Sequence, residues 1–362
     1  MHIKFTNLYK LIDEKNKILK KINKLIKESK FVGGQELYNF ENKFKKFVKS
    51  KYCIGVANGT DALEIAVKSL NLRKDSEIIV PVNTWISTAE AVVSNGFKVI
   101  FCDVDLDDYS ICLKDLKKKI TSKTRAIIAV HLYGNPADMN GIKKIIKGKN
   151  IKLLEDCAQA HGAKIDKKHV GNFGEIGTFS FFPGKNLGSF GDGGAIITSS
   201  KKIAQYSLRC RNHGALKKYD HLFVGRNSRL DTIQAGILNI KLNNYNKVLK
   251  KRNYLAKIYF EGLNKIDEIN LFKLRNKNQS SFHQFVIKTD SRNKLRKYLS
   301  DHNVETMIHY PYMLNQLKFF PQTKLNKANN LGNKILSLPI SEEHTKKEIL
   351  HIIKLIKNFF KK

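Results

Sequence analysis

The stretch FSFFPGKNLGSFGDGGAI, residues 179–196, places one lysine, Lys185, between an apolar segment and a glycine-rich segment. The flanking sequences GTFSFF (177–182) and GAIITSS (194–200) have strand character, which predicts two strands joined by a long glycine-rich loop. A lysine in such a partly dry setting has an amine that desolvation makes more available for reaction. The stretch therefore indicates a nucleophilic lysine that forms a Schiff base.

Two phosphate-binding motifs do not fit the same stretch. A P-loop needs GxxxxGK[ST], but the glycine before the GK pair is Gly177, seven positions upstream, and Asn186 follows the lysine. A dinucleotide fingerprint also fails, because the downstream glycines lack its spacing and its strand-to-helix context. These downstream glycines are Gly188, Gly191 and Gly193.

The chain has 362 residues, of which 42% are hydrophobic and 27% are charged. This length and composition predict one large domain and a smaller one with packed cores. No apolar run approaches the roughly 18 residues that a membrane-spanning helix needs. The first residues, MHIKFTNLYKLIDEKNKILKK, contain no apolar stretch of the signal-peptide kind. We therefore expect a cytoplasmic protein without a membrane partner.

The formal net charge is +34 at pH 7, and an excess of this size is one property of nucleic-acid-binding proteins. The lysines, however, are spread evenly among apolar residues, which is typical of a solvated surface. No known nucleic-acid-binding module is recognisable. We expect no nucleic-acid partner, although the positive field would attract an anionic substrate.

Arginine is rare, with ten arginines among the 66 basic residues. Four of the ten fall within residues 208–231, at Arg209, Arg211, Arg226 and Arg229. Because lysine cannot replace the planar guanidinium where geometry matters, this clustering indicates a structured and functional segment. Chance clustering explains it equally well.

The five cysteines are scattered, with no CxxC pair and no neighbouring histidine at a metal-site spacing. This pattern favours small buried apolar residues over a disulfide framework or a metal site. They are Cys53, Cys102, Cys112, Cys157 and Cys210. We expect no metal.

The first two-thirds of the chain alternates short apolar runs with segments of helical period, which predicts a mostly parallel sheet covered by helices. The expected strands are 52–57, 76–82, 97–104, 124–133 and 151–157, and the expected helices are 60–70, 84–95 and 141–148.

Residues 229–263 have a helical period, over a length that fits either one long connecting helix or a helix pair. The remainder mixes a strand at 282–288 with helices at 291–302 and 346–360. We expect a large domain at 1–240 and a smaller C-terminal α/β domain at 241–362.

Two further positions carry chemistry. In GVANGTDALEIAV a strand enters Gly59 and a helix begins at Thr60 or Asp61, so backbone N–H groups there can hold a phosphate or simply cap a helix. Asp156 ends an apolar strand, where open α/β sheets place their ligands. Its carboxylate is either a partner for a cofactor's pyridinium nitrogen or a helix cap or buried ion pair.

Five ordered motifs together resemble the signatures of the DegT/StrS-type sugar aminotransferases. These are VANGTDAL, PVNTWISTAEAV, EDCAQAHGA, FSFFPGKNLGSFGDGGA and GRNSRLDTIQAGIL. The likeness runs from about residue 30 to the C-terminus. It implies an enzyme that depends on pyridoxal 5′-phosphate (PLP), with the aspartate-aminotransferase fold (fold type I).

The resemblance implies roles for single residues. Lys185 would be the Schiff-base lysine and proton shuttle, and Asp156 would pair with the pyridinium. Gln159 would hydrogen-bond the 3-hydroxyl oxygen of the ring. Trp85, the only tryptophan, would stack on the ring face, although a plain core aromatic remains the alternative.

By the same resemblance, Gly59, Thr60 and Ser180 would hold the cofactor's phosphate. Asn227, in GRNSRLD, would reach that phosphate from the partner subunit, which would make a homodimer necessary for activity. His161, in AQAHGA, is either structural or close to the cofactor.

The segment MIHYPYMLN resembles the family's segment near the substrate, so His309 and Tyr310 are candidate substrate contacts or parts of a packed loop. Arg226, Lys217 and Lys218 are candidates for binding the pyrophosphate of a nucleotide-linked sugar.

The resemblance predicts transfer of an amino group from L-glutamate to a nucleotide-linked ketosugar, for polysaccharide or glycan biosynthesis. The form PGKN…GDGG is similar to members that aminate C3 of dTDP-3-keto-6-deoxyhexoses. A UDP-linked 3-keto N-acetyl sugar or a 4-keto sugar is the alternative. Dehydratases of this fold carry histidine in place of Lys185. A non-enzymatic regulatory or nucleic-acid-binding protein is the rival of another class.

Overall fold

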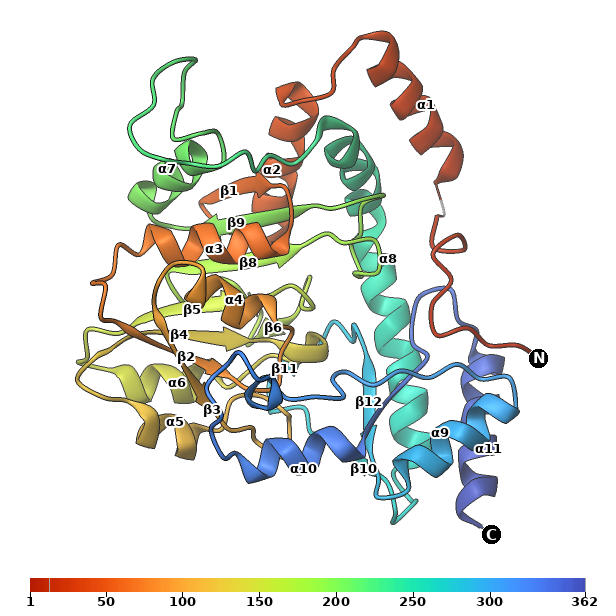
Figure 1. Cartoon of the computed structure of the whole chain (residues 1–362). Helices are drawn as coiled ribbons and strands as arrows, with labels where there is room; N and C mark the ends of the chain where they lie inside the picture. Colours follow the sequence, from red (N-terminus) through yellow and green to blue (C-terminus); the bar gives the residue numbers. More distant parts are fainter. Residues whose placement is uncertain (13, 362) are drawn as a thin grey trace.

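The computed structural model of the chain describes residues 1–12 and 14–361. Its largest feature is a seven-stranded sheet with the order β1-β9-β8-β5-β4-β2-β3 (Figure 1). All strands run in one direction except β9, which is antiparallel to both neighbours. The strands are β1 (Tyr52–Val56), β2 (Glu77–Pro81), β3 (Lys98–Cys102), β4 (Thr124–Val130), β5 (Lys152–Asp156), β8 (Ile176–Ser180) and β9 (Gly194–Thr198). The mostly parallel sheet expected from the sequence is confirmed.

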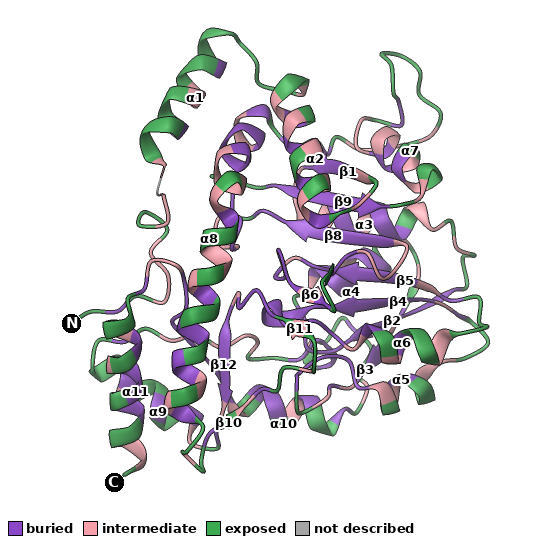
Figure 2. Cartoon of the chain, turned by 180° about the vertical axis from the view of Figure 1, so that it is seen from behind, coloured by how far each residue is buried: buried purple, intermediate pink, exposed green. Residues whose placement is uncertain are grey.

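Helices cover both faces of this sheet, and its central strands are therefore buried on both sides (Figure 2). In β2, Ile78 and Val80 join the hydrophobic cluster that contains residues of α3 and α4, whereas Ile79 joins the cluster with residues of α5 and α6. The covering helices are α2 (Gly34–Val48), α3 (Gly59–Ser69), α4 (Ser87–Val93), α5 (Leu113–Lys119), α6 (Met139–Ile146) and α7 (Lys201–Cys210).

Within residues 229–263, one long helix forms, α8 (Thr232–Leu263), and not a helix pair. It packs on α2 near its start and on α11 (Lys346–Phe360) near its end (Figure 1). The helix therefore connects the large sheet to the C-terminal part of the chain.

The C-terminal part contains a small antiparallel sheet, β10-β12-β13, flanked by helices. Its elements are β10 (Asn270–Leu271), β12 (Phe285–Lys288), α9 (Arg292–Asp301), α10 (Asn326–Lys334), β13 (Ile335–Leu338) and α11 (Lys346–Phe360). The boundary expected at residue 240 falls inside α8, and the division into 1–240 and 241–362 stays a prediction.

The remaining elements are short or peripheral. Helix α1 (Lys15–Lys27) packs on α8, and a second small sheet joins β11 to β6 and β7. These elements are β6 (Lys164–Ile165), β7 (Lys168–His169), β11 (Asn278–Gln279) and the 3₁₀ turns η1 (Leu132–Gly134) and η2 (Leu314–Gln316).

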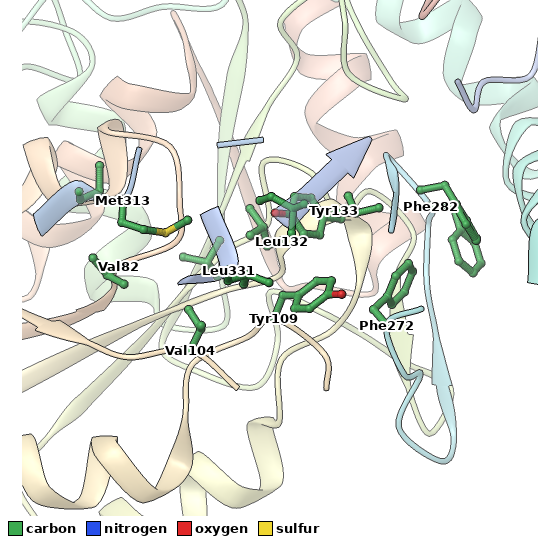
Figure 3. Packing of buried hydrophobic residues seen from close by; sticks show 14 of the residues in the cluster. Val82, Val104, Tyr109, Leu132, Tyr133, Phe272, Phe282, Met313 and Leu331 are labelled. Carbon is green, nitrogen blue, oxygen red and sulfur yellow. The ribbon is translucent and has the colours of Figure 1, made fainter. Parts of the chain in front are cut away.

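One hydrophobic core runs through both parts of the chain. Val82, Tyr109 and Tyr133 lie in the same buried cluster as residues that follow α8 in the sequence, Phe272, Phe282 and Met313 (Figure 3). The C-terminal part is thus packed directly on the edge of the large sheet where its strands end.

The five cysteines are free and buried, as expected from their scattered spacing. Within residues 1–12 and 14–361, no helix combines the length and the apolar character needed to span a membrane.

Candidate active site

The sheet topology brings the three chemically important segments together. Asp156 is the last residue of β5, and Lys185 follows β8, the next strand in the sheet. Gly59 opens α3 directly after β1. Parallel strands place their carboxyl ends at one edge of a sheet, where open α/β folds bind ligands.

Asp156 is only 4% exposed, and neutral donors hold its carboxylate. Its Oδ2 accepts a hydrogen bond from the Thr88 hydroxyl at 2.8 Å, and its Oδ1 accepts one from the Ala158 N–H at 3.0 Å. A second hydroxyl, that of Thr84, lies 2.9 Å from the Thr88 oxygen. Because Thr88 gives its only proton to Asp156, Thr84 must donate to Thr88.

Lys185 lies in the turn after β8, where its N–H donates to the Phe182 carbonyl at 2.8 Å. Its side chain is half-buried. Burial lowers the pKa of the Lys185 amine to about 8, while the charge of Asp156 acts in the opposite direction. A substantial fraction of the amine is therefore neutral near physiological pH, as a nucleophile requires.

The first turn of α3 forms a cradle suited to an anion. Gly59 has no room for a side chain, because a Cβ there would lie 2.7 Å from the Ser180 Cβ. The Thr60 and Ser87 hydroxyls are 2.7 Å apart, so both α3 and α4 supply hydroxyl groups. The N-terminal N–H groups of an 11-residue helix add a favourable dipole.

Gln159 links β5 to the C-terminal part of the chain. Its Oε1 accepts a hydrogen bond from the Tyr133 N–H at 2.7 Å, and its Nε2 donates to the Tyr310 hydroxyl at 3.0 Å. The Tyr133 hydroxyl donates to the His309 carbonyl. The structure therefore brings Tyr310 and His309, two candidate substrate residues, into the region of Gln159.

Trp85 is 58% exposed, so it is not a core aromatic. Its ring centroid lies 5.7 Å from that of Tyr310, with the two planes tilted by 45°. A flat indole face is thus available beside the Gln159–Tyr310 pair. This exposure is compatible with the predicted stacking on a cofactor ring, which stays a prediction.

Three histidines lie within the electrostatic range of Lys185. Burial and the lysine's charge lower the pKa of His161 to about 3 and that of His309 to about 4, and they lower the pKa of His283 as well. His161 is fully buried between the rings of Phe179 and Phe181, at centroid distances of 5.4 and 5.6 Å.

The sequence alone does not single out several residues that the structure places in this region. Thr88 and Ser87 stand inside the quoted motif PVNTWISTAEAV, and their place at the start of a helix after a parallel strand was an available signal. His283 has no such signal, because FHQFVIK has only the pattern of a buried strand.

The arginine-rich segment 208–231 begins with the last residues of α7 and continues as a projecting loop beside this helix (Figure 1). Its four arginines hold it in place. Arg209 contacts Asp220, and Arg229 contacts Asn212. Arg211 contacts Glu41 and the Gly55 carbonyl, and Arg226 contacts Asp61 and Glu64.

Within one subunit, the described contacts do not connect the candidate residues of this loop to Lys185 or Asp156. Arg226 is 2.9 Å from the Asp61 carboxylate, and Lys217 and Lys218 are exposed. Asn227 is also exposed. Their assignments to substrate and to a partner subunit's cofactor stay predictions.

A buried group of His131, Glu155 and Cys157 has the composition of a metal site, but the His131 ring nitrogens and the Glu155 carboxylate are already hydrogen-bonded within the protein. His131 Nδ1 accepts the Ala137 N–H at 3.1 Å, so its Nε2–H donates to Glu155 at 3.0 Å. Three backbone N–H groups also donate to the Glu155 carboxylate, at 2.6–2.7 Å. The group therefore braces β5 and does not need a cation.

Known proteins share this whole architecture. The chain is 37% identical to a dTDP-3-amino-3,6-dideoxy-alpha-D-galactopyranose transaminase of Aneurinibacillus thermoaerophilus, over 93% of this chain and 94% of the relative. It is also 37% identical to a UDP-N-acetyl-3-dehydro-alpha-D-glucosamine 3-aminotransferase of Acidithiobacillus ferrooxidans, over 95% and 94%.

Solved structures of aminotransferases are also similar to this chain. The structure of S. venezuelae DesV in complex with a ketimine intermediate matches with a TM-score of 0.97 and 32% identity, over 100% of this chain and 99% of DesV. A Bacillus subtilis protein with the bound cofactor PMP matches with a TM-score of 0.90 and 28% identity, over 98% and 85%.

The model of the DegT/DnrJ/EryC1/StrS aminotransferase family matches residues 12–357, nearly the whole chain. The resemblance inferred from the five motifs is confirmed, and so are the fold and the dependence on PLP. With its buried Asp156, its lysine of lowered pKa and its helix-end cradle, the chain belongs to the DegT/DnrJ/EryC1/StrS family of PLP-dependent aminotransferases.

Proposed function

We propose that this aminotransferase moves an amino group from L-glutamate to C3 of a dTDP-linked 3-keto-6-deoxyhexose. The observation that supports the chemistry is that burial lowers the pKa of the Lys185 amine to about 8, while the negative charge of the buried Asp156 carboxylate acts on the same amine. The choice of C3 and dTDP is supported by the PGKN…GDGG form of the lysine loop and by the 37% identity to the dTDP-3-amino sugar transaminase.

The chemistry of the site residues fits PLP: an amine, a buried carboxylate and a helix N-terminus with hydroxyl groups. The lysine amine would hold the cofactor covalently, and the cradle of Gly59, Thr60 and Ser180 would take its phosphate. When bound, PLP supplies an electron sink for the carbon that loses or gains the amino group. The side chains of the protein would transfer the proton and orient the ring.

Lys185 would move the proton. Burial lowers the pKa of its amine to about 8, so a neutral Nζ that can take up a proton is accessible near neutral pH. Such a group accepts a proton from the substrate carbon and returns it in the reverse direction with little penalty. Asp156 would keep a negative charge next to the pyridinium nitrogen, held in orientation by Thr88 and the Ala158 N–H.

Trp85 and Gln159 would fix the ring in place. The exposed indole offers a face for stacking, and Gln159 is anchored by the Tyr133 N–H so that its amide keeps one orientation. His309 and Tyr310, which approach from the C-terminal part, would contact the sugar.

We further propose a homodimer in which Asn227 of each subunit completes the phosphate site of the other. The exposure of Asn227 and of its loop supports this assignment. Arg226, Lys217 and Lys218 would then lie near the pyrophosphate of the nucleotide, because all three belong to the same loop. The product would supply polysaccharide or glycan synthesis.

A UDP-linked 3-keto N-acetyl sugar is the second candidate substrate. It is favoured by the equal identity, 37%, to the 3-aminotransferase of Acidithiobacillus ferrooxidans. Both substrates carry the same pyrophosphate, so the basic loop does not discriminate between them.

The test is incubation of the purified, PLP-loaded protein with glutamate and a panel of ketosugar nucleotides, followed by mass spectrometry. Amination of dTDP-3-keto-6-deoxyhexoses is the expected result. Activity on UDP-linked 3-keto sugars alone would transfer the assignment to the second candidate. Activity on 4-keto sugars alone would overturn the assignment to C3.

A further inference from the structure

The lysine-bearing turn is anchored by the residue that follows the lysine. Asn186 is 3% exposed, and its side chain makes two hydrogen bonds to the segment Ser280–Gln284, called the 280–284 segment below. Its Nδ2 donates to the Ser281 carbonyl at 2.9 Å. Its Oδ1 lies 2.9 Å from His283 Nδ1.

These two contacts fix the tautomer of His283. A carbonyl oxygen can only accept, so the amide nitrogen of Asn186 must face Ser281 and the amide oxygen must face His283. His283 Nδ1 must therefore carry the proton that it donates to Asn186. Burial, followed by the charges of Lys185 and Arg252, lowers the pKa of His283 well below its ordinary value, so Nε2 is left unprotonated.

The 280–284 segment is itself held tightly by the large-sheet part of the chain. The Ser281 N–H donates to the Gly134 carbonyl at 3.0 Å, and the Ser281 hydroxyl donates to the Gln159 carbonyl at 3.1 Å. A Cβ on Gly134 would lie 2.4 Å from the Ser281 hydroxyl, so the two backbones approach closely. Arg252 from α8 donates to the Phe282 carbonyl at 3.0 Å.

Phe282 has a left-handed backbone, with φ of 42°, which is costly for a residue with a large side chain. Its ring is buried against Phe272, at a centroid distance of 6.2 Å (Figure 3). Strained conformations of this kind persist where the surrounding structure determines them and are frequent at active sites. The next residue, His283, is the one that contacts Asn186 in the lysine-bearing turn.

We propose that His283 is a positioning residue for Lys185: its Nδ1–H holds Asn186, which fixes the lysine-bearing turn against the C-terminal part of the chain. This inference rests on the proposed role of Lys185 as the reacting amine. A small displacement of the Lys185 amine would slow the reaction strongly, because a misplacement of about 1 Å can reduce the rate about 100-fold.

Three substitutions of His283 test whether the hydrogen-bond donor at Nδ1 matters, apart from the other properties of the imidazole ring. In His283→Asn the amide nitrogen is attached to Cγ, like Nδ1, and can still donate to Asn186. In His283→Gln it is one carbon further away, near the place of Nε2. His283→Ala removes both.

The rate to be measured is the spectral conversion of the PLP-loaded enzyme by glutamate alone, which requires no sugar substrate. We expect His283→Asn to keep the wild-type maximal rate within about threefold, and His283→Gln and His283→Ala to lose about 10- to 100-fold, with little change in the glutamate KM. Equal rates for the Asn, Gln and Ala variants would overturn the proposal.

The matched control is His302, whose Nδ1 also bonds a carbonyl, that of Tyr298, at 2.7 Å, but on an exposed helix end. The same three substitutions at His302 should leave the rate unchanged. If the wild type itself is not converted by glutamate, the proposed function fails and not this inference.

A second measurement needs no variant to be active. In PLP-loaded wild-type protein with ¹⁵N-labelled histidine, the His283 ring should be neutral at pH 7 with its proton on Nδ1. Its signals are identified by their loss in His283→Asn. A proton on Nε2, or on both nitrogens, would refute the assigned hydrogen bond and the positioning role with it.

Discussion

Removal of the Thr88 hydroxyl tests most directly how the Asp156 carboxylate, at the centre of the site, is held. It donates to Asp156 Oδ2 at 2.8 Å and is completely buried. Thr88→Val has nearly the same shape and removes this donor. A hydrogen bond to a charged group contributes about 1.5–3 kcal/mol to stability. We therefore expect the free energy of unfolding of the cofactor-free protein to fall by about 2 kcal/mol.

The substitution should also reduce activity, because the Asp156 carboxylate loses the donor that orients it. We expect conversion of the PLP-loaded enzyme by glutamate to slow by about tenfold, the effect of a modest misplacement in the site. Urea unfolding gives the stability, and the change of the cofactor's absorption after mixing with glutamate gives the rate.

Thr84→Val is the matched control. It removes the bond between the Thr84 and Thr88 hydroxyls, 2.9 Å apart, but leaves the donor to Asp156 in place. It should cost about 1 kcal/mol, the net contribution of a neutral hydrogen bond, with less effect on the rate. The reasoning is refuted if Thr88→Val is as stable and as fast as Thr84→Val.

Three further predictions follow from the same geometry. In the cofactor-free protein the Lys185 amine should become reactive toward acylating reagents as the pH rises through about 8, because burial lowers its pKa and deprotonation yields the nucleophile; a midpoint near 10.4, that of an ordinary lysine, would contradict this. Gly59→Ala should weaken PLP binding at least tenfold in an absorbance titration and destabilise the protein by about 1–3 kcal/mol, because its Cβ would lie 2.7 Å from the Ser180 Cβ. The double variant Lys217→Ala/Lys218→Ala should raise the KM for the sugar nucleotide several-fold, with the glutamate KM unchanged, in steady-state assays.

Two controls belong to these predictions. Gly236→Ala, in α8, would bring a Cβ no closer than 3.2 Å to a flexible lysine side chain, so PLP affinity should not change. The double variant Lys201→Ala/Lys202→Ala removes two exposed lysines on α7, and its KM for the sugar nucleotide should equal that of the wild type. An equal rise in KM for both lysine pairs would show a general charge effect and contradict the role of the loop.

The sequence predicted the parts of the fold that depend on local pattern. The apolar strands before Asp156 and on both sides of Lys185 lie at the expected positions, because buried strands and amphipathic helices leave clear periodicities. The same patterns could not decide whether residues 229–263 form one helix or two. That outcome depends on packing against α2 and α11, which are far away in the sequence.

In the candidate site, too, residues in local motifs could be predicted, whereas residues that depend on distant contacts could not. Gly59, Asp156 and Lys185 could be named as candidates because each lies at the end of a predicted strand or soon after one, in a recognisable motif. His283 was not found, because its role depends on a hydrogen bond to Asn186, 97 residues earlier in the chain. The pairing of Arg226 with Asp61 and Glu64 was likewise beyond the sequence, since it requires the loop to fold back on α3.

We propose that the amine of Lys185 carries the cofactor. Borohydride reduction of the PLP-loaded protein, followed by peptide mapping, tests it most directly because it makes the link between lysine and cofactor permanent. We expect a pyridoxyl group on Lys185, the lysine of the PGKN sequence, and on no other of the chain's many lysines. A pyridoxyl group on another residue, or none at all, would contradict it.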